Sequence, residues 1–369
     1  MSTAVCRWGM LGTANIARKN WKAIRNAENS SLVAVASRVP ERASQFIEEC
    51  QANVPLTPRP AACGSYQQLL DRDDIDAVYL PLPTGIRKEW VLKAARAGKH
   101  VLCEKPCAVS SADLCAMLDA CRENKVQFMD GVMFMHSRRL PMLRQTLDDG
   151  RSIGSLRRIT SQFSFPAGDD FLTTNIRANS LLEPLGCLGD LGWYNIRFSL
   201  WLMNEQLPER VTGRLLAAHN PGTGAPVPME FSGELIFFRG GESASFFCSF
   251  LTVNQQWATV SGTRGALHIQ DFVLPFYGSE VSFEADAPVH RVWGCDFNME
   301  SHLRRLAVDE YSNGMPNAQE TNMIRTFAQI VISGQLQPRW GEQALATQRV
   351  LDALLCSAKQ DGNVVALVR

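Results

Sequence analysis

The sequence has no excess of charge of either sign, because its 37 lysine and arginine residues equal its 37 aspartate and glutamate residues. A balanced chain lacks the basic surface that nucleic acids and anionic membranes attract, so we expect neither as a partner. The sequence also lacks an apolar run of about 18 residues, the length that spans a bilayer, and its start shows no signal-peptide pattern. We therefore expect a soluble, cytoplasmic protein.

The spacing typical of metal sites is absent as well. Cys103 and Cys107 are separated by three residues, no C-x-x-C occurs, and no H-x-x-x-H pair exists. We therefore expect no metal. The 11 cysteines are odd in number, and several stand in apolar runs such as 101–103 and 246–248. This pattern favours buried free thiols over disulfides.

The chain is long enough for two domains, since 369 residues exceed one average domain and each half can bury its own core. We place the domains at residues 1–135 and 136–369. Alternating strands and helices in the first half predict a parallel, doubly wound sheet. The expected strands are 5–12, 31–38, 76–83, 100–106 and 126–134. The expected helices are 14–27, one from about Pro40, 66–70, 86–97 and one that is capped by 110–113 and runs through Asn124, with a proline-rich connection over 53–64.

The first strand and the first helix meet at a short run of small residues, Gly12, Thr13, Ala14, Asn15 and Ile16, followed by Ala17. This run resembles the dinucleotide fingerprint G-x-G-x-x-G/A, with Ala14 at the second glycine. In that motif the backbone approaches the pyrophosphate, and the helix N-terminus binds it through free N–H groups and its dipole. The five residues from Gly12 to Ile16 are candidate cofactor ligands, although small residues at such a junction also suit tight packing.

The second strand ends in Ser37 and Arg38, where a dinucleotide site that prefers NAD carries an acidic residue for the ribose. A guanidinium there suits a 2′-phosphate, and a charge-assisted hydrogen bond contributes about 1.5 to 3 kcal/mol. We therefore expect NADP(H) to be preferred over NAD(H). A solvated arginine after a strand is the alternative interpretation.

Two further strands end in candidate cofactor ligands, since open α/β sheets bind ligands at the carboxyl ends of their strands. The candidates are Leu82, Pro83 and Thr84 after one strand, and Glu104, Lys105 and Pro106 after the next. Thr84 is equally explained as the N-cap of the following helix. We interpret Lys105 as facing both cofactor and substrate.

The second half reads as an antiparallel sheet with two closing helices, 319–333 and 341–359. Its expected strands are 156–165, 211–218, 230–238, 243–252, 256–262 and 266–272, after a helix near 141–149. In 235–238 and 246–251 apolar residues fall on both parities, whereas a sheet with one wet face should alternate. Helices on one face and a second subunit on the other would explain this, so we predict a homodimer or homotetramer formed through the sheet.

Asp190 and Tyr194 are the candidate catalytic residues of the second half. They are four residues apart, and side chains at that spacing on a helix lie on the same face. A helix cap for Asp190 and a core position for Tyr194 are the alternatives. Candidate substrate contacts are His136, Arg139, Asn175 and Arg177, with ordinary structural hydrogen bonding as the alternative. Phe163, Phe165, Phe171 and Trp193 suit either an apolar wall for a sugar or simple core packing.

Together these residues resemble the glucose-fructose oxidoreductase, inositol dehydrogenase and rhizopine-catabolism family of nicotinamide-dependent oxidoreductases. The resemblance covers nearly the whole chain and looks closest to the dihydrodiol and xylose dehydrogenase-like branch. It rests on 9–17, Glu104-Lys105-Pro106, 186–194, Ser333-Gly334 and Gly341-Glu342.

The family resemblance implies an α/β protein: an N-terminal Rossmann domain and a C-terminal α/β domain with a large, mostly antiparallel open sheet. It also implies that Lys105 binds and polarises the reacting oxygen, that Tyr194 donates or accepts the proton, and that Asp190 orients substrate or tyrosine. Pro106 is expected in cis. Many relatives carry histidine where Tyr194 stands, so this chain departs from the majority there, as it does at Ala14.

The chemistry is coherent from the residues alone, because hydride transfer from an alcohol needs a cationic donor near the oxygen and an acid-base group in reach. We predict an NADP(H)-dependent oxidoreductase acting on a secondary alcohol or carbonyl of a sugar, inositol or diol. The alternatives are a catalytically silent nucleotide-binding regulator, which the joint presence of Lys105, Asp190 and Tyr194 disfavours, and a redox-assisted glycosidase, which the missing acidic ribose ligand disfavours.

Overall fold

The computed structural model describes residues 4–168, 170–220, 222, 224–237 and 241–367. The chain forms two compact units. The first unit comprises 1–136, 181–184 and 311–348, and the second comprises 137–180, 185–310 and 349–369. The chain thus enters the second unit one residue beyond the predicted domain boundary, whereas 311–348, placed in the second domain by sequence, belong to the first unit.

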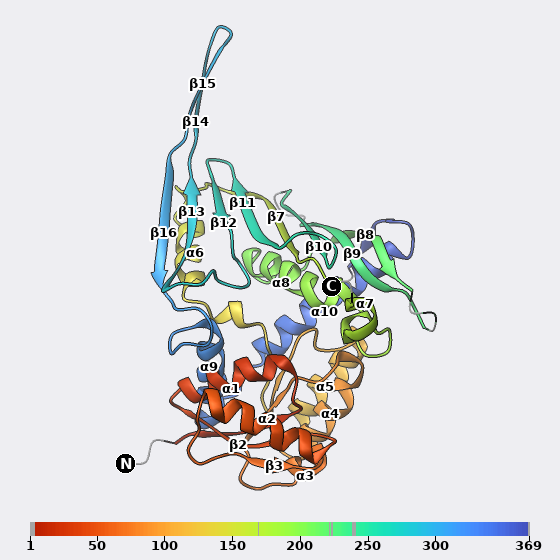
Figure 1. Cartoon of the computed structure of the whole chain (residues 1–369). Coiled ribbons are helices and arrows are strands. Elements are labelled where there is room, and N and C mark those ends of the chain that lie inside the picture. Colours follow the sequence, from red (N-terminus) through yellow and green to blue (C-terminus); the bar gives the residue numbers. More distant parts are fainter. Residues whose placement is uncertain (1–3, 169, 221, 223, 238–240, 368–369) are drawn as a thin grey trace. The chain divides into compact units, whose positions relative to one another are not determined.

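The first unit is built on a parallel sheet with the strand order β3-β2-β1-β4-β5-β6. Figure 1 labels β2 and β3 at one edge of this unit. This order is that of a Rossmann fold, which confirms the predicted doubly wound sheet. The strands are β1 (Cys6–Leu11), β2 (Ser30–Ala36), β3 (Ala61–Cys63), β4 (Ala77–Leu80), β5 (His100–Cys103) and β6 (Phe128–Asp130). Strand β3 lies in the segment predicted as a connection, so that prediction was wrong.

Three helices of the first unit begin at residues that suit a helix start. Pro40 opens its helix, and the hydroxyls of Ser65 and Ser110 accept hydrogen bonds from the N–H groups of Gln68 and Asp113. The helices are α1 (Asn15–Asn26), α2 (Pro40–Asn53), α3 (Tyr66–Leu70), α4 (Thr84–Arg96), α5 (Ser111–Glu123) and α9 (Gln319–Ser333), with a 3₁₀ turn at Met133–His136.

Helix α9 belongs to the first unit because its apolar face packs against α1 and β1. The ring of Phe327 lies 5.1 Å from that of Trp8, centroid to centroid, and Lys19 forms a 2.5 Å ion pair with Glu320. Both partners come from the first 30 residues, so a helix far along the chain completes the N-terminal core. Sequence periodicity identified this helix but not the surface that it covers.

The second unit contains a nine-stranded sheet with the order β16-β13-β12-β11-β7-β10-β9-β8-β17 and a separate two-stranded ribbon, β14-β15. Among the described residues, the neighbouring strands all pair antiparallel except β7 with β10, so the sheet is mostly antiparallel, as expected. The strands are β7 (Leu156–Ser164), β8 (Arg210–His219), β9 (Val227–Ile236), β10 (Ser243–Ser249), β11 (Gln255–Gly262), β12 (Ala266–Ile269), β13 (Glu280–Asp286), β14 (Val289–Trp293), β15 (Asp296–Glu300), β16 (Leu303–Asp309) and β17 (Val365–Ala366). Strands β13 to β17 were not predicted, and Phe238, the last residue of one predicted strand, lies outside the described residues.

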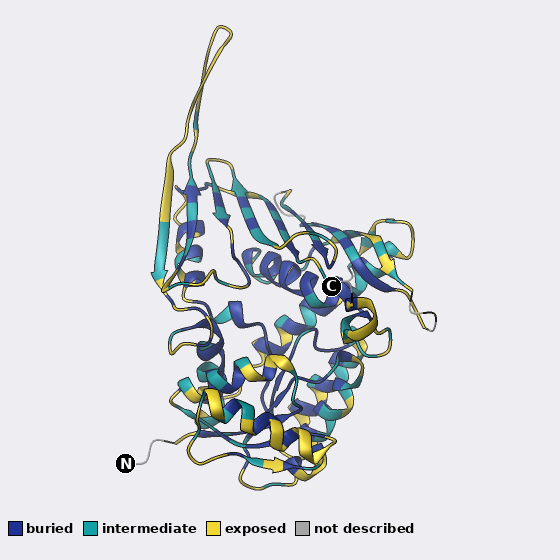
Figure 2. Ribbon diagram, in the orientation of Figure 1, coloured by how far each residue is buried: buried dark blue, intermediate teal, exposed yellow. Residues whose placement is uncertain are grey.

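Helices cover one face of this sheet. They are α6 (Arg139–Asp148), α8 (Trp193–Leu202) and the second-unit part of α10 (Arg339–Ala358), and Figure 1 shows α6 and α8 along the same side of the strands. Side chains alternate between buried and half-exposed along β9, β10 and β13 (Figure 2). Leu235 and Phe246 point into the core, whereas Ile236 and Phe247 stay half-exposed. This chain therefore covers one face of the sheet, and the predicted second subunit on the other face stays a prediction.

All 11 cysteines are free thiols, and eight of them are buried, which agrees with the prediction from their apolar surroundings. Burial raises the pKa of the Cys6 and Cys121 thiols, the latter to about 12, so these groups stay protonated and unreactive. Within the described residues, no helix combines the length and apolarity needed to cross a membrane.

Candidate active site

The junction of β1 and α1 has the geometry of an anion site. Gly12 has φ +115°, and a Cβ there would also lie 3.2 Å from the side chain of Leu82. Ala14 precedes the helix in an extended conformation, contributes no side-chain cap, and the first turn of α1 carries no acid. The N–H groups at this helix start therefore suit a bound pyrophosphate, which fits the predicted dinucleotide site.

Ser37 and Arg38 differ in their accessibility at the end of β2. Ser37 is buried, and its hydroxyl accepts a hydrogen bond from Val39 N at 3.3 Å. Arg38 is exposed and faces the hydroxyl of Tyr66. Burial raises the pKa of Tyr66, and the Arg38 cation partly opposes that rise. Arg38 is the group with a charge to offer a 2′-phosphate, while Ser37 shapes the turn.

A buried arginine missed by the sequence analysis joins the two strand ends that carry the predicted ligands. Arg87 on α4 is 5% exposed, and its guanidinium donates to the carbonyl of Leu82 at 2.6 Å and to the carbonyl of Pro106. These two hydrogen bonds fix the loop after β4 to the turn after β5. Arg87 therefore positions Lys105, which directly precedes Pro106.

The start of α4 is capped by a carboxylate distant in sequence. Thr84 donates from its backbone N to Glu183 Oε1 at 3.0 Å and from its hydroxyl to Glu183 Oε2 at 2.6 Å. Gly85 N donates to Leu182 O at 2.9 Å, and a Cβ on Gly85 would lie 2.0 Å from Leu181 O. The hydroxyl proton of Thr84 is thus committed to Glu183, so Thr84 offers a cofactor only its oxygen lone pairs.

Glu104 has a buried partner that the sequence analysis did not identify. The Tyr79 hydroxyl donates to Glu104 Oε1 at 2.6 Å and accepts from Asn20 Nδ2 at 2.7 Å. Burial raises the pKa of Tyr79 well above its usual value, so the hydroxyl stays a donor. Lys105 N donates to Glu104 Oε2 at 3.3 Å, so the carboxylate holds the backbone from which the Lys105 side chain projects.

The peptide bond between Lys105 and Pro106 is cis, as the family resemblance implied. Lys105 itself is partly exposed, at the carboxyl end of β5. His136, the last predicted ligand in the first unit, ends the 3₁₀ turn and stacks on Trp340 with ring centroids 4.7 Å apart. Its ring is therefore placed by an aromatic contact within the first unit.

In the second unit, Asp190 and Tyr194 lie on one continuous helical segment, which confirms the helix expected there. A π-helical turn over Leu188–Gly192 runs directly into α8. Gly186 before it has φ +48°, and a Cβ would lie 2.1 Å from Pro228 O, so only glycine fits. Tyr194 is 6% exposed and meets Phe163 edge to face at 5.6 Å.

Three of the predicted residues form a chain of contacts in the second unit. Arg177 Nε donates to Asp190 Oδ2 at 2.7 Å, and the Asn175 side chain accepts from Arg177 N at 3.0 Å. The side chain of Asp190 is 15% exposed and that of Arg177 43% exposed. Arg177 therefore orients the Asp190 carboxylate, and Asn175 fixes the turn that carries Arg177.

The side chain of Arg139 is buried and paired with groups of the protein, so it is not placed to bind a ligand. Its side chain is 4% exposed and forms a 2.5 Å ion pair with Asp271, and it also donates to the carbonyls of Asp271 and Ser282. A guanidinium so enclosed has its donors directed at the protein itself. We therefore withdraw Arg139 as a substrate contact and assign it to the fixing of α6 against the sheet.

Replacing Arg139 with alanine is expected to lower the free energy of unfolding by about 3 to 5 kcal/mol, because Asp271 would keep a buried, uncompensated charge. Urea denaturation followed by tryptophan fluorescence measures this. Replacing both partners, with Arg139→Met and Asp271→Leu, should cost less than the single change, since no charge is left behind. An unchanged urea midpoint for Arg139→Ala would contradict the assignment.

Two family models match most of the chain. The model of an oxidoreductase family with an NAD-binding Rossmann fold matches residues 6–132, and the GFO/IDH/MocA C-terminal domain model matches residues 142–268. The chain passes from the first unit to the second after residue 136, between the two matched segments. They include Gly12, Lys105, Asp190 and Tyr194.

Relatives support the same family. D-xylose 1-dehydrogenase (NADP(+)) 2 of Haloferax volcanii is 29% identical over 362 residues, 97% of this chain and 98% of that protein. Trans-1,2-dihydrobenzene-1,2-diol dehydrogenase of Mus musculus is 30% identical over 273 residues, 73% of this chain and 76% of that protein. The 3-ketoreductase KijD10 of Actinomadura kijaniata, solved with NADP and TDP-benzene, aligns with a TM-score of 0.78 and 26% identity, over 96% of this chain and 98% of that one.

Proposed function

Since the chain belongs to the GFO/IDH/MocA family of NAD(P)-dependent oxidoreductases, we propose that it transfers hydride between NADP(H) and a secondary alcohol or carbonyl carbon of a sugar, inositol or diol. The observation that carries this proposal is the placement of Lys105. The backbone that carries Lys105, at the carboxyl end of β5, is held on one side by the Glu104 and Tyr79 hydrogen bonds and on the other by the bond from Arg87 to the Pro106 carbonyl. Rigid placement of a donor is what stabilises charge on a reacting oxygen.

The nicotinamide, when bound, supplies or accepts the hydride. In the proposal, the Lys105 ammonium donates a hydrogen bond to the substrate oxygen and stabilises the negative charge that develops there. Tyr194 exchanges the proton with the same oxygen. The Asp190 carboxylate, oriented by Arg177, hydrogen-bonds the substrate beside the reacting carbon. Asn175 supports this arrangement through Arg177, and His136 is retained as a further substrate contact.

The cofactor part of the proposal assigns the pyrophosphate to the start of α1 and the 2′-phosphate to Arg38. Gly12, with its positive φ, and the acid-free first turn of α1 support the first assignment. The exposed guanidinium of Arg38, together with the absence of an acid at that strand end, supports the second. The relative from H. volcanii is named for NADP(+), and KijD10 was solved with NADP.

Replacing Arg38 with alanine is expected to lower the preference for NADP⁺ over NAD⁺ by roughly 10- to 100-fold, the value of one charge-assisted hydrogen bond. The measurement is kcat/KM for each cofactor at a fixed, saturating substrate concentration. Arg96→Ala, an exposed arginine in the last turn of α4, is the matched control and should leave the ratio unchanged. Faster turnover of the wild type with NAD⁺ would contradict the cofactor assignment itself.

The proposed reaction is tested with a panel of aldoses, inositols and trans-dihydrodiols, each offered with NADP⁺ and with NAD⁺, and with the carbonyl counterparts and NADPH. Absorbance at the nicotinamide band reports turnover. We expect activity with at least one class and free exchange of the cofactor. Purified protein that retains its cofactor through turnover would instead support the redox-assisted glycosidase.

The proposal also includes a homodimer or homotetramer formed through the open face of the nine-stranded sheet, and a cytoplasmic location. The half-exposed side chains on that face, which this chain does not cover, support the oligomer. The free thiols of all 11 cysteines support a reducing compartment.

A further inference from the structure

Strands β14 and β15 form an arm that the family match does not account for. We define the arm as residues 287–302, which comprise both strands, the turn between them and the residues that join them to β13 and β16. Both family models end before it, the second at residue 268. The arm extends beyond the other strands of the second unit as a two-stranded ribbon (Figure 1), and most of it is exposed (Figure 2).

The arm continues the register of the sheet without a break. In the sheet, Glu284 pairs with Arg305 and Asp286 with Leu303, and in the arm Val289 pairs with Glu300 in the same register. Since side chains alternate between faces along a strand, the even-numbered residues of β13 and β14 share one face. Phe283, on the other face, is buried under the helices. The face of the arm that follows Glu284 therefore continues the open face of the sheet.

That face of the arm is apolar. It carries His290 and Val292 from β14, opposite Met299 and Phe297 from β15. Val292 is 57% exposed, Phe297 67% and Met299 76%, and the ring of His290 stacks on that of Phe297 at 5.9 Å. We call these four residues the apolar arm face.

The opposite face of the arm has a different composition. It pairs Arg291 with Asn298 and Trp293 with Asp296, and the Arg291 guanidinium lies 3.9 Å from the Glu300 carboxylate. This face holds the charges of the ribbon, and its apolar side chains in the described arm are Val289 and Trp293. An isolated two-stranded ribbon is only marginally stable in water, so the apolar face requires a cover that this chain does not supply.

The open face of the sheet has the composition of a protein interface. Across its centre, Ser232, Phe247, Gln162 and Trp257 stand side by side on four adjacent strands. The charges beside this row are paired, since Arg158 lies 2.9 Å from Glu234. The sequence contains no lysine between Lys125 and Lys359. Lysine is among the residues that are depleted in protein interfaces relative to the rest of the surface.

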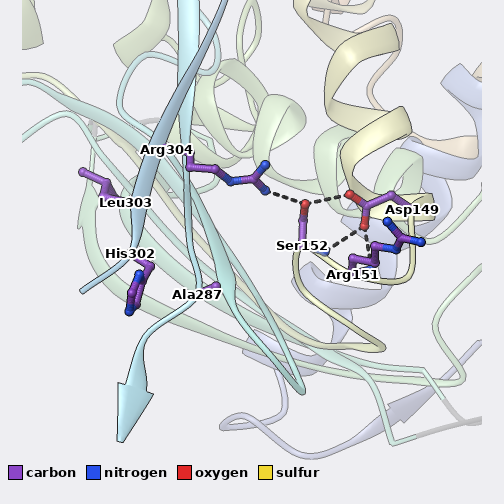
Figure 3. A pocket seen from close by; sticks show the side chains of 7 residues that line it. All are labelled: Asp149, Arg151, Ser152, Ala287, His302, Leu303 and Arg304. Atoms are coloured by element: carbon purple, nitrogen blue, oxygen red, sulfur yellow. Dashed lines mark hydrogen bonds between the residues drawn. The ribbon is translucent and has the colours of Figure 1, made fainter. Parts of the chain in front are cut away.

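The base of the arm is fixed in the second unit. Arg304, just after the arm, donates to Ser152 Oγ at 2.9 Å, and that hydroxyl donates to Asp149 Oδ2 at 2.7 Å (Figure 3). Hydrogen bonds from the N–H groups of Arg151 and Ser152 hold the same carboxylate and lower the pKa of Asp149. These contacts line a pocket of about 550 Å³ beside His302. The arm therefore leaves the sheet from an anchored base.

We propose that the apolar arm face binds a second copy of this chain, as an extension of the interface formed by the open sheet face. The proposal rests on the homo-oligomer of the proposed function. Continuity of the two faces argues for the same partner on both, and a two-fold axis lets each arm contact the other subunit with the same residues. The arm of one subunit then lies on its partner, and the exchange is reciprocal.

Light scattering coupled to size-exclusion chromatography, over a dilution series, tests the proposal. The double variant Val292→Ser/Phe297→Ser removes the apolar arm face, and Trp293→Ser is the matched control on the opposite face. We expect the double variant to raise the dissociation constant of the oligomer by roughly 10- to 100-fold, as loss of buried interface aromatics does. Trp293→Ser should leave it within about twofold. A third variant, with 289–300 replaced by Asn-Gly, removes the arm and closes the hairpin with a favoured turn.

The possible outcomes separate the arm from the oligomer. A wild type that is monomeric throughout the series overturns both this proposal and the proposed oligomer. An oligomer that resists removal of the arm overturns the arm proposal alone. Equal effects of Val292→Ser/Phe297→Ser and Trp293→Ser on the dissociation constant overturn the assignment of the face. Hydrogen exchange gives an independent measurement on the wild type. Amides of 289–300 should exchange more slowly in concentrated than in dilute protein, and equal rates would contradict burial of the arm.

Discussion

Replacing Lys105 with alanine is expected to lower kcat by roughly 10² to 10⁴ while leaving the affinity for NADPH largely intact. The ammonium acts on the reacting oxygen, and its contribution is needed only when charge develops there. The backbone around it is fixed by Glu104, Tyr79 and Arg87, so truncation of the side chain leaves the turn in place. Steady-state kinetics measure kcat, and fluorescence titration with NADPH measures cofactor affinity.

The control for this variant is Lys93→Ala, which removes a half-exposed lysine on α4 that pairs with Glu89. It should show wild-type kinetics. Lys105→Arg should recover only part of the activity, because a planar guanidinium does not place its donors where an ammonium does. Wild-type turnover of Lys105→Ala on an identified substrate would contradict the proposed role.

Replacing Tyr194 with phenylalanine is expected to lower kcat by a similar factor of roughly 10² to 10⁴, because the hydroxyl that exchanges the proton is lost. The ring keeps its edge-to-face contact with Phe163, so folding should be preserved. The variant should also lose the limb of the pH-rate profile that reports the proton-transfer group. Full pH profiles of kcat and kcat/KM for both proteins measure this.

An exposed tyrosine supplies the matched control. Tyr277 is 92% exposed, and Tyr277→Phe should change neither kcat nor its pH dependence. If Tyr194→Phe raised KM with kcat and the pH profile unchanged, Tyr194 would be a binding residue and another group would transfer the proton.

Most of the fold follows from local sequence signals, and the misses have physical causes. Long apolar strands can be recognised from the sequence, and so can helices that begin at a suitable residue, such as Pro40 and Ser110. Strand β3 was missed because three small residues inside a proline-rich segment carry no periodicity. Strands β14 to β16 were missed because their residues are mostly exposed, so burial imposes no clear alternation on them.

The candidate site was predictable where a residue type and a strand end coincide, and less so where contacts join distant segments. Lys105 and Arg38 follow strands, and Tyr194 follows Asp190 by one helical turn. Tyr79 stands in the predicted strand 76–83, and a tyrosine in a buried strand needs a hydrogen-bond partner for its hydroxyl. That requirement signals a buried polar partner, which the structure identifies as Glu104. Nothing local marks Glu183, whose partner Thr84 lies 99 residues away.

Arg139 shows why a residue type near a domain junction is weak evidence for ligand binding. The sequence offers an arginine just past the last parallel strand, where either a substrate or an internal acid would suit it. Its partner Asp271 is 132 residues further along the chain. Only the folding of the second sheet brings the two together, so sequence proximity held no information about the pair.

The carboxylate of Glu183 at the start of α4 bears on the choice of inhibitors. Helices α1 and α4 of the first unit each begin just after a strand that carries predicted ligands, and helix starts favour anions. At α1 the first turn is free of acid, whereas at α4 Glu183 already occupies the N–H and hydroxyl of Thr84. A phosphate or carboxylate brought to α4 would meet a like charge and lose those donors. Fragment libraries for this enzyme should therefore favour neutral polyols over acids.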